Sequence, residues 1–226
     1  MGIAIVAALP REIVGLVGGT KPDREPLRRG VHLYRLPGAT VVAAGMGGAR
    51  VTLAVEAALR WAPVEMLLSA GLAGACSAEV RPGDVVEART VVDARTGERY
   101  AANGGCTRGA TLVTSEAIAG VREKARLAAS YDADLVDMEA ATVARLAMAR
   151  GLAFRAIKGV SDAHDFEMES MSRFADRHGH FRTGAFALHT AVRPWRWGSA
   201  VRLGRNSNRA LSRMHERLRE VLKDAG

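Results

Sequence analysis

The sequence predicts one α/β domain in which helices pack on a sheet. Short runs of Ile, Val, Leu and Ala alternate with longer segments of helical composition, and several of these runs end in glycine or an acidic residue. The chain has 226 residues, of which 48% are hydrophobic and only 5% aromatic. This length and composition can build one large core, in which small side chains let helices pack closely on strands.

Composition also excludes several broad classes of protein. The chain has only two cysteines, Cys76 and Cys106, which argues against a disulfide framework and favours a reducing, cytoplasmic setting. No apolar run approaches the ~20 residues that a membrane-spanning helix needs. The apolar start, residues 2–8, is short and lacks a basic leader, so we interpret it as a first strand rather than a signal peptide.

The first sixty residues predict a strand, a hairpin and two helices. Pro10 follows the strand at residues 2–8 and suits the first turn of a short helix. Residues 31–44 form two apolar runs around a Pro-Gly pair, which predicts a β-hairpin. A glycine cluster at residues 45–50 then lets backbone approach a ligand closely, before a helix over residues 51–61. This cluster matches neither a dinucleotide fingerprint nor a P-loop.

The middle of the chain predicts further strands, a glycine turn and a short helix. Residues 64–70 are almost continuously apolar, as in a buried central strand, and the turn at residues 71–75 ends this strand. Residues 93–110 are polar and contain glycine, so we interpret them as a loop or lid. The other predicted strands are residues 85–92, 111–114 and 134–138, and the short helix runs from residue 115 to residue 124.

The next segment joins a helix to a strand that ends in two polar residues. Residues 140–150 are rich in Ala, which favours a helix, and Gly151 supplies a C-terminal stop. Residues 152–160 are typical of a strand, and Ser161 and Asp162 stand at its carboxyl end.

Positive charge is concentrated at the C-terminal end. The net charge is +8, and residues 193–226 hold nine Lys or Arg against three acids, which accounts for +6 of it. We therefore divide the chain into one domain at residues 1–192, with a last helix candidate at 184–192, and a basic amphipathic helical extension at 193–226. The apolar stripe of this extension consists of Leu211, Met214, Leu218 and Val221.

The extension is expected to dock on the body or on a second subunit. Peripheral contact with a membrane, which Trp195 and Trp197 would favour, is the alternative. Nucleic acid is not an expected partner. Among the histidines only His178 and His180 form a close pair, and no cysteine accompanies them, so neither a metal nor a cofactor is expected.

Three acidic residues stand where strands meet helices or loops. Glu12 lies just past the first strand, Glu139 opens the helix at residues 140–150, and Asp162 closes the strand after it. Ligands of open α/β sheets bind at the carboxyl ends of strands, so we expect these acids to converge. The helix N-terminus should hold Glu139 ionised, ready to accept hydrogen bonds from a sugar diol. Alternatively, Glu12 is a solvated first-turn acid and Glu139 only caps its helix.

These residues resemble motifs of the nucleoside phosphorylase and nucleosidase superfamily, in particular its methylthioadenosine/S-adenosylhomocysteine nucleosidases. The resemblance covers about residues 2 to 165 and implies a three-layer fold of the phosphorylase/hydrolase type, with a central mixed, twisted sheet flanked by helices. The matching pieces are Ala7-Ala8-Leu9-Pro10-Arg11-Glu12, Gly45-Met46-Gly47, Ala70-Gly71-Leu72-Ala73-Gly74, Pro82-Gly83-Asp84, Val136-Asp137-Met138-Glu139-Ala140-Ala141 and Val160-Ser161-Asp162.

The resemblance implies cleavage of the N-glycosidic bond of a purine nucleoside in the cytoplasm, by a protein that is expected to be a homodimer. Glu12 would activate the attacking water, Glu139 would bind the ribose hydroxyls, and Asp162 would protonate the leaving base. The other expected substrate-binding residues are Met46, Gly71, Leu72, Ala73, Gly74, Ala117, Ile118, Met138 and Ser161.

Alternative functions follow from departures from the family pattern. Leu72 replaces a small polar residue, and residues 114–118 replace a segment that normally brings a Phe to the purine. The chain after Asp162 looks more like the hopanoid-associated phosphorylase branch, which would imply a phosphate-dependent reaction on a lipid-linked adenosyl substrate. Phosphate would need cations such as Arg11 and Arg50, whereas Glu12 would repel it, so hydrolysis is preferred. A non-catalytic nucleoside-binding protein is the third possibility.

Overall fold

The computed structural model describes residues 2–103, 109–167 and 197–224. Within these residues nine strands form one sheet in the order β2-β3-β1-β4-β8-β7-β5-β6, and β9 pairs with β4 and β5. The strands are β1 (Ile3–Ala7), β2 (His32–Leu36), β3 (Ala39–Ala43), β4 (Met66–Ala75), β5 (Val85–Asp93), β6 (Arg99–Ala101), β7 (Ala110–Thr114), β8 (Leu135–Asp137) and β9 (Ala153–Asp162). The helices are η1 (Pro10–Glu12), α1 (Val14–Val17), α2 (Arg24–Arg28), α3 (Gly48–Trp61), α4 (Val121–Tyr131), α5 (Ala140–Met148) and α8 (Trp197–Asp224).

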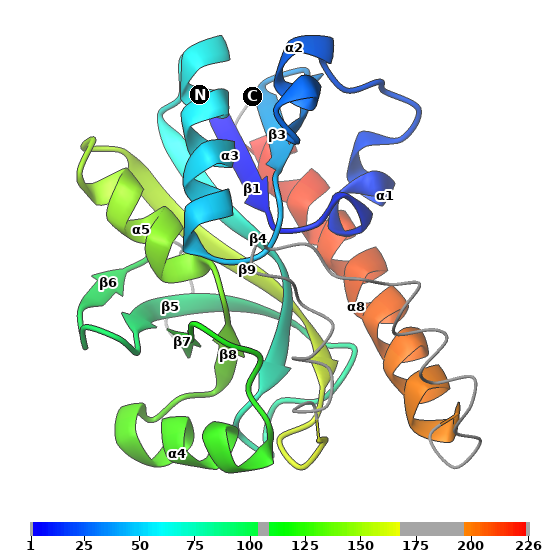
Figure 1. The fold of residues 1–226 in the computed structure, drawn as a ribbon, viewed down its shortest axis with the longest axis vertical. Helices are drawn as coiled ribbons and strands as arrows, with labels where there is room; N and C mark the ends of the chain where they lie inside the picture. The colour runs from blue at the N-terminus through cyan, green and yellow to red at the C-terminus, as the bar shows by residue number, and fades with distance from the viewer. Residues whose placement is uncertain (1, 104–108, 168–196, 225–226) are drawn as a thin grey trace.

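Helices cover both faces of this sheet (Figure 1). α3 and α5 lie on one face, and α1 and α8 lie on the other. The alternation of side chains along β1 serves both layers, because Ala4 and Val6 join the core under α3 and α5 while Ile3 and Ile5 join the core under α8. The strand pairs include parallel ones, such as β1 with β4, and antiparallel ones, such as β4 with β8. The predicted three-layer fold with a mixed sheet is confirmed.

Most predicted elements are present, with ends shifted by a few residues. The hairpin pairs β2 with β3 in antiparallel register, and Pro10 begins η1. Gly151 has a φ of 65° just after α5, as a helix stop requires. The helix candidate at residues 184–192 lies outside the described residues.

Three predicted boundaries are wrong, because sheet partners override local composition. The glycine turn at residues 71–75 is the second half of β4, since β9 pairs with it on one side and β8 on the other. The helix expected at 115–124 is instead α4, which starts after Gly120, because the Ser115 N–H donates to the Asp137 carbonyl and holds the chain on the sheet. The segment at 93–110, expected to be a loop, contains β6.

The C-terminal helix α8 docks on the body of the protein. Its apolar stripe is buried in the core that also contains Ile3, Ile5 and Ile157. No helix in the described part of the chain is both long and apolar enough to cross a membrane. Membrane contact and a homodimer stay predictions. The buried residues of the stripe are Leu211, Met214, Leu218 and Val221.

Candidate functional site

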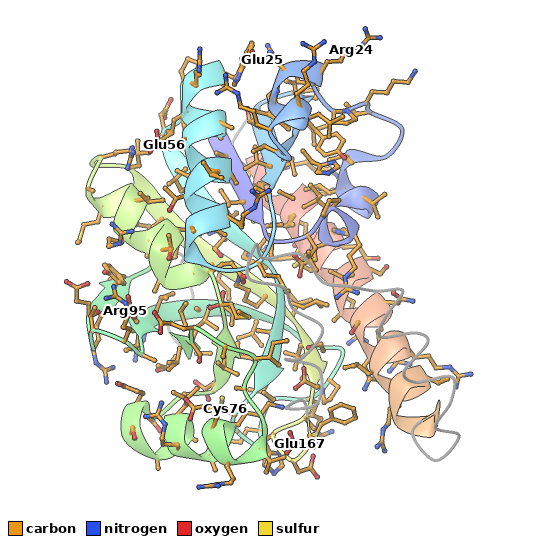
Figure 2. All side chains as sticks on the ribbon, viewed as in Figure 1. Arg24, Glu25, Glu56, Cys76, Arg95 and Glu167 are labelled. Carbon is orange, nitrogen blue, oxygen red and sulfur yellow. The ribbon has the colours of Figure 1, made fainter. Side chains whose placement is uncertain are left out.

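Buried charges gather at one place in the molecule. Charged side chains such as Arg24, Glu56 and Arg95 are exposed at its periphery (Figure 2). Among the described residues, the buried acids and lysines form one group, in which the acids end or follow strands and each lysine is paired with one of these acids. They are Glu12, Lys124, Asp137, Glu139, Lys158 and Asp162. Charged residues are rarely buried unless they are paired or functional, so this group defines the candidate site.

A cavity of about 330 Å³ opens at these strand ends. Every predicted site residue except Gly71 lines it, and Gly71 lies directly behind Glu12. The lining residues are Ala8, Leu9, Arg11, Glu12, Met46, Leu72, Ala73, Gly74, Ala117, Ile118, Ala119, Lys124, Val136, Asp137, Met138, Glu139, Ser161, Asp162, Leu203, Gly204, Ser207, Asn208 and Leu211. Its volume and its mixture of apolar walls with a few charged groups suit a small organic ligand.

Glu12 is held by backbone and is not a solvated acid. The short turn η1 brings its carboxylate back over the end of β1, where Oε2 accepts N–H bonds from Ala8 (3.1 Å) and Leu9 (2.9 Å). Oε1 accepts the N–H of Leu72 at 3.1 Å. The side chain is buried, with 5% of the residue exposed, so the solvated alternative is wrong. A carboxylate has roughly four acceptor positions, which leaves room for one further donor from the cavity.

Gly71 is a glycine because Glu12 occupies the space of a side chain. Its φ of 132° is one that residues with a Cβ rarely adopt, and a Cβ there would lie 3.2 Å from the Glu12 carboxylate. Side chains of α8 contact the backbone of both residues. Met214 Sδ accepts the Gly71 N–H at 3.3 Å, and the His215 ring lies 2.7 Å from the Glu12 carbonyl.

Glu139 points into the cavity instead of capping α5. It stands at the N-cap position without a side-chain cap bond, and Asp137 Oδ2 accepts the Ala140 N–H in its place at 3.0 Å. Glu139 Oε1 accepts the N–H of Gly47, at the start of α3, at 2.9 Å. The capping alternative is therefore wrong, and the glycine cluster contributes a backbone donor to the site.

The charge expected on Glu139 also needs correction. Burial and then the negative charge of Asp137 raise the pKa of Glu139 to about 8, although Lys158 and the Gly47 N–H oppose them. The carboxyl group therefore keeps its proton to a higher pH than an ordinary glutamate does. Helix N-termini favour charge by typically 0.3–1 kcal/mol, which is less than the desolvation of a fully buried acid.

Lys158 offsets the negative charge of Asp137, which lines the cavity. Its ammonium lies 2.8 Å from Asp137 Oδ2 and donates to Ser69 Oγ at 3.0 Å. Burial lowers the pKa of Lys158, but Asp137 and Glu139 outweigh burial and raise it overall. Asp137 also accepts the Thr114 hydroxyl at 2.7 Å, so it is fixed from both sides. Asp137 and Lys158 therefore form a charged floor that sequence reasoning did not assign to the site.

Asp162 reaches the cavity because β9 is irregular at its end. The register of β4 and β9 shifts between Ala73 and Gly74, so that Gly74 pairs with Asp162 and Ser161 is the extra residue. Such a bulge redirects the side chains that follow it. A Cβ on Gly74 would lie 3.0 Å from Asp162 Oδ2, so this position also has to be small. The Ser161 hydroxyl contacts Asp162 Oδ1 and the Ala73 carbonyl.

Sequence reasoning missed one wall of the cavity and one cation. Leu203, Ser207 and Asn208 of α8 face the cavity, although the stripe on this helix predicted docking only. Lys124 was taken as the end of a helix, yet it lies in the first turn of α4 and pairs with Asp162. The available signal was spacing, because Lys124 lies three residues before Leu127 and therefore on the same face of α4, which the structure shows to be buried.

Potential metal ligands are not clustered in the described part of the chain. No group of three or more His, Cys, Asp or Glu there could hold a metal ion. His178 and His180 lie outside the described residues.

A cavity lined by buried acids at the carboxyl ends of strands is typical of α/β proteins that bind or convert a small molecule. A model of the phosphorylase superfamily matches residues 2–105 and 101–190, so the chain belongs to this superfamily. No curated protein matches the chain.

Solved structures with the same fold include several nucleosidases. The chain is similar to Arabidopsis thaliana 5′-methylthioadenosine nucleosidase in its apo form (18% identity, TM-score 0.74, 100% of this chain and 96% of the other). It is also similar to futalosine hydrolase of Helicobacter pylori (18%, TM-score 0.64, 85% and 97%). A third is the S. pneumoniae 5′-methylthioadenosine/S-adenosylhomocysteine nucleosidase with the inhibitor MT-ImmA (20%, TM-score 0.61, 73% and 88%). At these identities the likeness establishes the fold.

Proposed function

We propose that this protein hydrolyses the N-glycosidic bond of a purine nucleoside. The observation that carries the proposal is the convergence of Glu12, Glu139 and Asp162 on one cavity. They come from the ends of β1, β8 and β9, and each is buried. The phosphorylase superfamily and the nucleosidase neighbours support the same class of reaction.

The reaction requires the protein to stabilise positive charge on the sugar and negative charge on the base. Breaking the bond between ribose and purine leaves a cation-like sugar and an anionic base. Gly71 and Gly74 contact Glu12 and Asp162 respectively. Two residues three positions apart on a strand are about 10 Å apart, which is the scale of a nucleoside. In this proposal Glu12 faces the sugar and Asp162 faces the base.

Each acid then has a distinct role. Glu12 has an acceptor position left for the attacking water and takes its proton. Glu139 contacts the ribose hydroxyls, and the developing positive sugar favours its ionised form. Asp162 delivers a proton to the departing purine, which removes charge from the leaving group. Met46, Met138 and Leu72 supply apolar walls around the sugar and base.

Water is favoured over phosphate as the nucleophile by the charges beside Glu12. The Arg50 guanidinium donates to the carbonyls of Ala44 (2.5 Å) and Gly30 (3.1 Å), so it is engaged with backbone. Of the arginines and lysines among the described residues, only Arg11 and Lys124 line the cavity, and Lys124 is paired with Asp162. A phosphate beside the Glu12 carboxylate would therefore have a single cation to offset the repulsion.

We infer a 5′-methylthioadenosine/S-adenosylhomocysteine-type substrate as the finer proposal. It is supported by the nucleosidase activity of the Arabidopsis and S. pneumoniae neighbours and by the apolar residues Leu203 and Leu211 in the α8 wall. An apolar wall suits a thioether substituent better than a free hydroxyl.

The test is release of free base from a panel of purine nucleosides, with and without phosphate, followed by chromatography. We expect release without phosphate, and a loss of about 100-fold or more in kcat for both Glu12→Gln and Asp162→Asn. Glu79→Gln, an exposed acid outside the cavity, is the matched control and should keep full activity. A strict need for phosphate would replace hydrolysis by phosphorolysis, and binding without turnover would replace catalysis by binding.

A further inference from the structure

A buried lysine stands directly behind the acid that faces the leaving base. Lys124 projects from the first turn of α4, and only 1% of its side chain is exposed. Its ammonium pairs with Asp162 Oδ2 and donates to the carbonyls of Ala163 (2.8 Å) and Phe166 (3.2 Å). All three N–H bonds of the ammonium are therefore used, and Asp162 is its one anionic partner among the described residues.

This pairing raises a question about the proton for the base. A carboxylate that faces an ammonium in a buried site is ionised, because an unpaired buried charge would be strongly destabilising. Ser161 also contacts the other oxygen of Asp162, so both oxygens are in contact with donor groups. An ionised Asp162 has no proton to give to a departing purine. The proton has to enter the carboxylate from a neighbour.

We propose that Lys124 is the source of this proton and that Asp162 passes it to the leaving base. As the bond between C1′ and the purine nitrogen breaks, its electron pair goes to the purine. One proton moves from Lys124 Nζ to Asp162, and one moves from Asp162 to the purine, so the base leaves neutral and the lysine becomes a neutral amine. The attacking water gives its hydroxyl to C1′ and its proton to Glu12. Glu12 then releases its proton to solvent, and solvent returns one proton to Lys124.

Lys124 is better suited to donate a proton to Asp162 than the other ionisable groups nearby. Arg11, the other cation on the cavity wall, cannot release its proton at ordinary pH. Cys76 interacts electrostatically with Lys124 and Asp162. Burial is the main cause that raises the pKa of its thiol to about 12, so the thiol stays neutral. Glu123 and Asp134 also face this region, and Glu123 is paired with Arg126 on the exposed side of α4.

Lys124 touches Asp162 rather than the base, so it acts on the reaction only through that carboxylate. The inference rests on the proposed hydrolysis of a purine nucleoside. Two substrates separate proton supply from structural support. 5′-Methylthioadenosine has a leaving base that needs a proton, whereas p-nitrophenyl β-D-riboside has a leaving group that is stable as an anion. Both require the same attack of water at the sugar.

The experiment compares Lys124→Met and Lys124→Arg with wild type on both substrates between pH 5 and pH 9. We expect both variants to lose about 100-fold or more in kcat on the purine nucleoside at pH 8. Lys124→Met should recover partly at pH 5, because a buried Asp162 without its cation takes up a proton there. Lys124→Arg should not recover, because arginine keeps both the pairing and its proton. Turnover of the p-nitrophenyl riboside should change little in either variant.

Arg122→Met, which removes an exposed cation from the same helix, is the control and should match wild type. Equal losses on both substrates, or an unchanged pH profile in Lys124→Met, would overturn the inference and leave Lys124 a structural residue. Full activity in Lys124→Arg would overturn it as well. A wild-type protein that cleaves neither substrate would instead refute the proposed function, and the inference with it. Thermal unfolding of each variant identifies any that fail to fold, and Lys124→Arg, which keeps the charge, then carries the test.

Discussion

Glu139→Gln should make the protein more stable while it abolishes efficient turnover. The pKa of Glu139 is raised from an ordinary 4.5 to about 8, chiefly by burial. Between these two values the folded protein binds more protons than the unfolded chain, so this group lowers stability as pH rises. The penalty grows between about pH 4.5 and pH 8 and is constant above that range. Glutamine cannot ionise, and its carbonyl can still accept the Gly47 N–H.

The size of the effect follows from the same shift. Each pKa unit corresponds to about 1.4 kcal/mol, so the full shift would be worth about 5 kcal/mol above pH 8. Glu139 titrates together with Asp137 and Lys158, so part of this energy belongs to the group as a whole. We therefore expect Glu139→Gln to stabilise the protein by about 2 kcal/mol at pH 8 and by close to zero at pH 4.5. For a chain of this length, 2 kcal/mol corresponds to about 4–8 °C in Tm.

Urea unfolding at pH 5, 7 and 9 measures this difference directly, with the exposed Glu56→Gln as a control for the loss of one acid. A stability gap that does not change with pH would refute the assignment of a raised pKa to Glu139. Steady-state assays of the same variant should show a kcat reduced by about 100-fold, because a neutral amide cannot offset the positive charge of the sugar. A stable variant with normal kcat would show that the carboxylate is not needed for turnover.

Three further predictions concern the supports of the site. Gly71→Ala places a Cβ 3.2 Å from the Glu12 carboxylate at a φ of 132°, so we expect a loss of about 1–3 kcal/mol and a lower kcat, measured by urea unfolding and base release; unchanged kcat would contradict the contact. Lys158→Met leaves Asp137 buried without its cation and should destabilise the protein by about 3–5 kcal/mol at pH 8; a loss below 1 kcal/mol would argue against the ion pair. His215→Phe removes the contact with the Glu12 carbonyl, and it should lower kcat more than it raises KM, which a larger change in KM would refute.

Local signals in the chain were sufficient for most of the strands, the hairpin and the acids, but not for β6. Continuous apolar runs identified β1, β3 and the first half of β4, because strands buried on both faces carry few polar residues. Glu12 and Glu139 were visible because an acid beside an apolar run at a strand end is unusual. The rule that ligands bind at the carboxyl ends of strands was enough to group these acids with Asp162.

Local signals could not predict the environment of each charged side chain. The bulge at Ser161, which turns Asp162 toward the cavity, depends on the register of β4 against β9, two strands far apart in the chain. The raised pKa of Glu139 depends on burial and on Asp137, and these outweigh the helix terminus that sequence reasoning relied on. In the same way, the extension of β4 through Ala75 depends on partners that only folding supplies.

The order of apolar runs and acids along the chain specifies an α/β protein with acids at its strand ends, because burial patterns and helix stops are local properties, whereas the three layers were implied by the family resemblance. The pairing of Lys124 with Asp162, the charged floor under Glu139 and the α8 wall arise from contacts between segments that are distant in sequence. Charge states in the site follow from those contacts, because desolvation and neighbouring ions act through space and not along the chain.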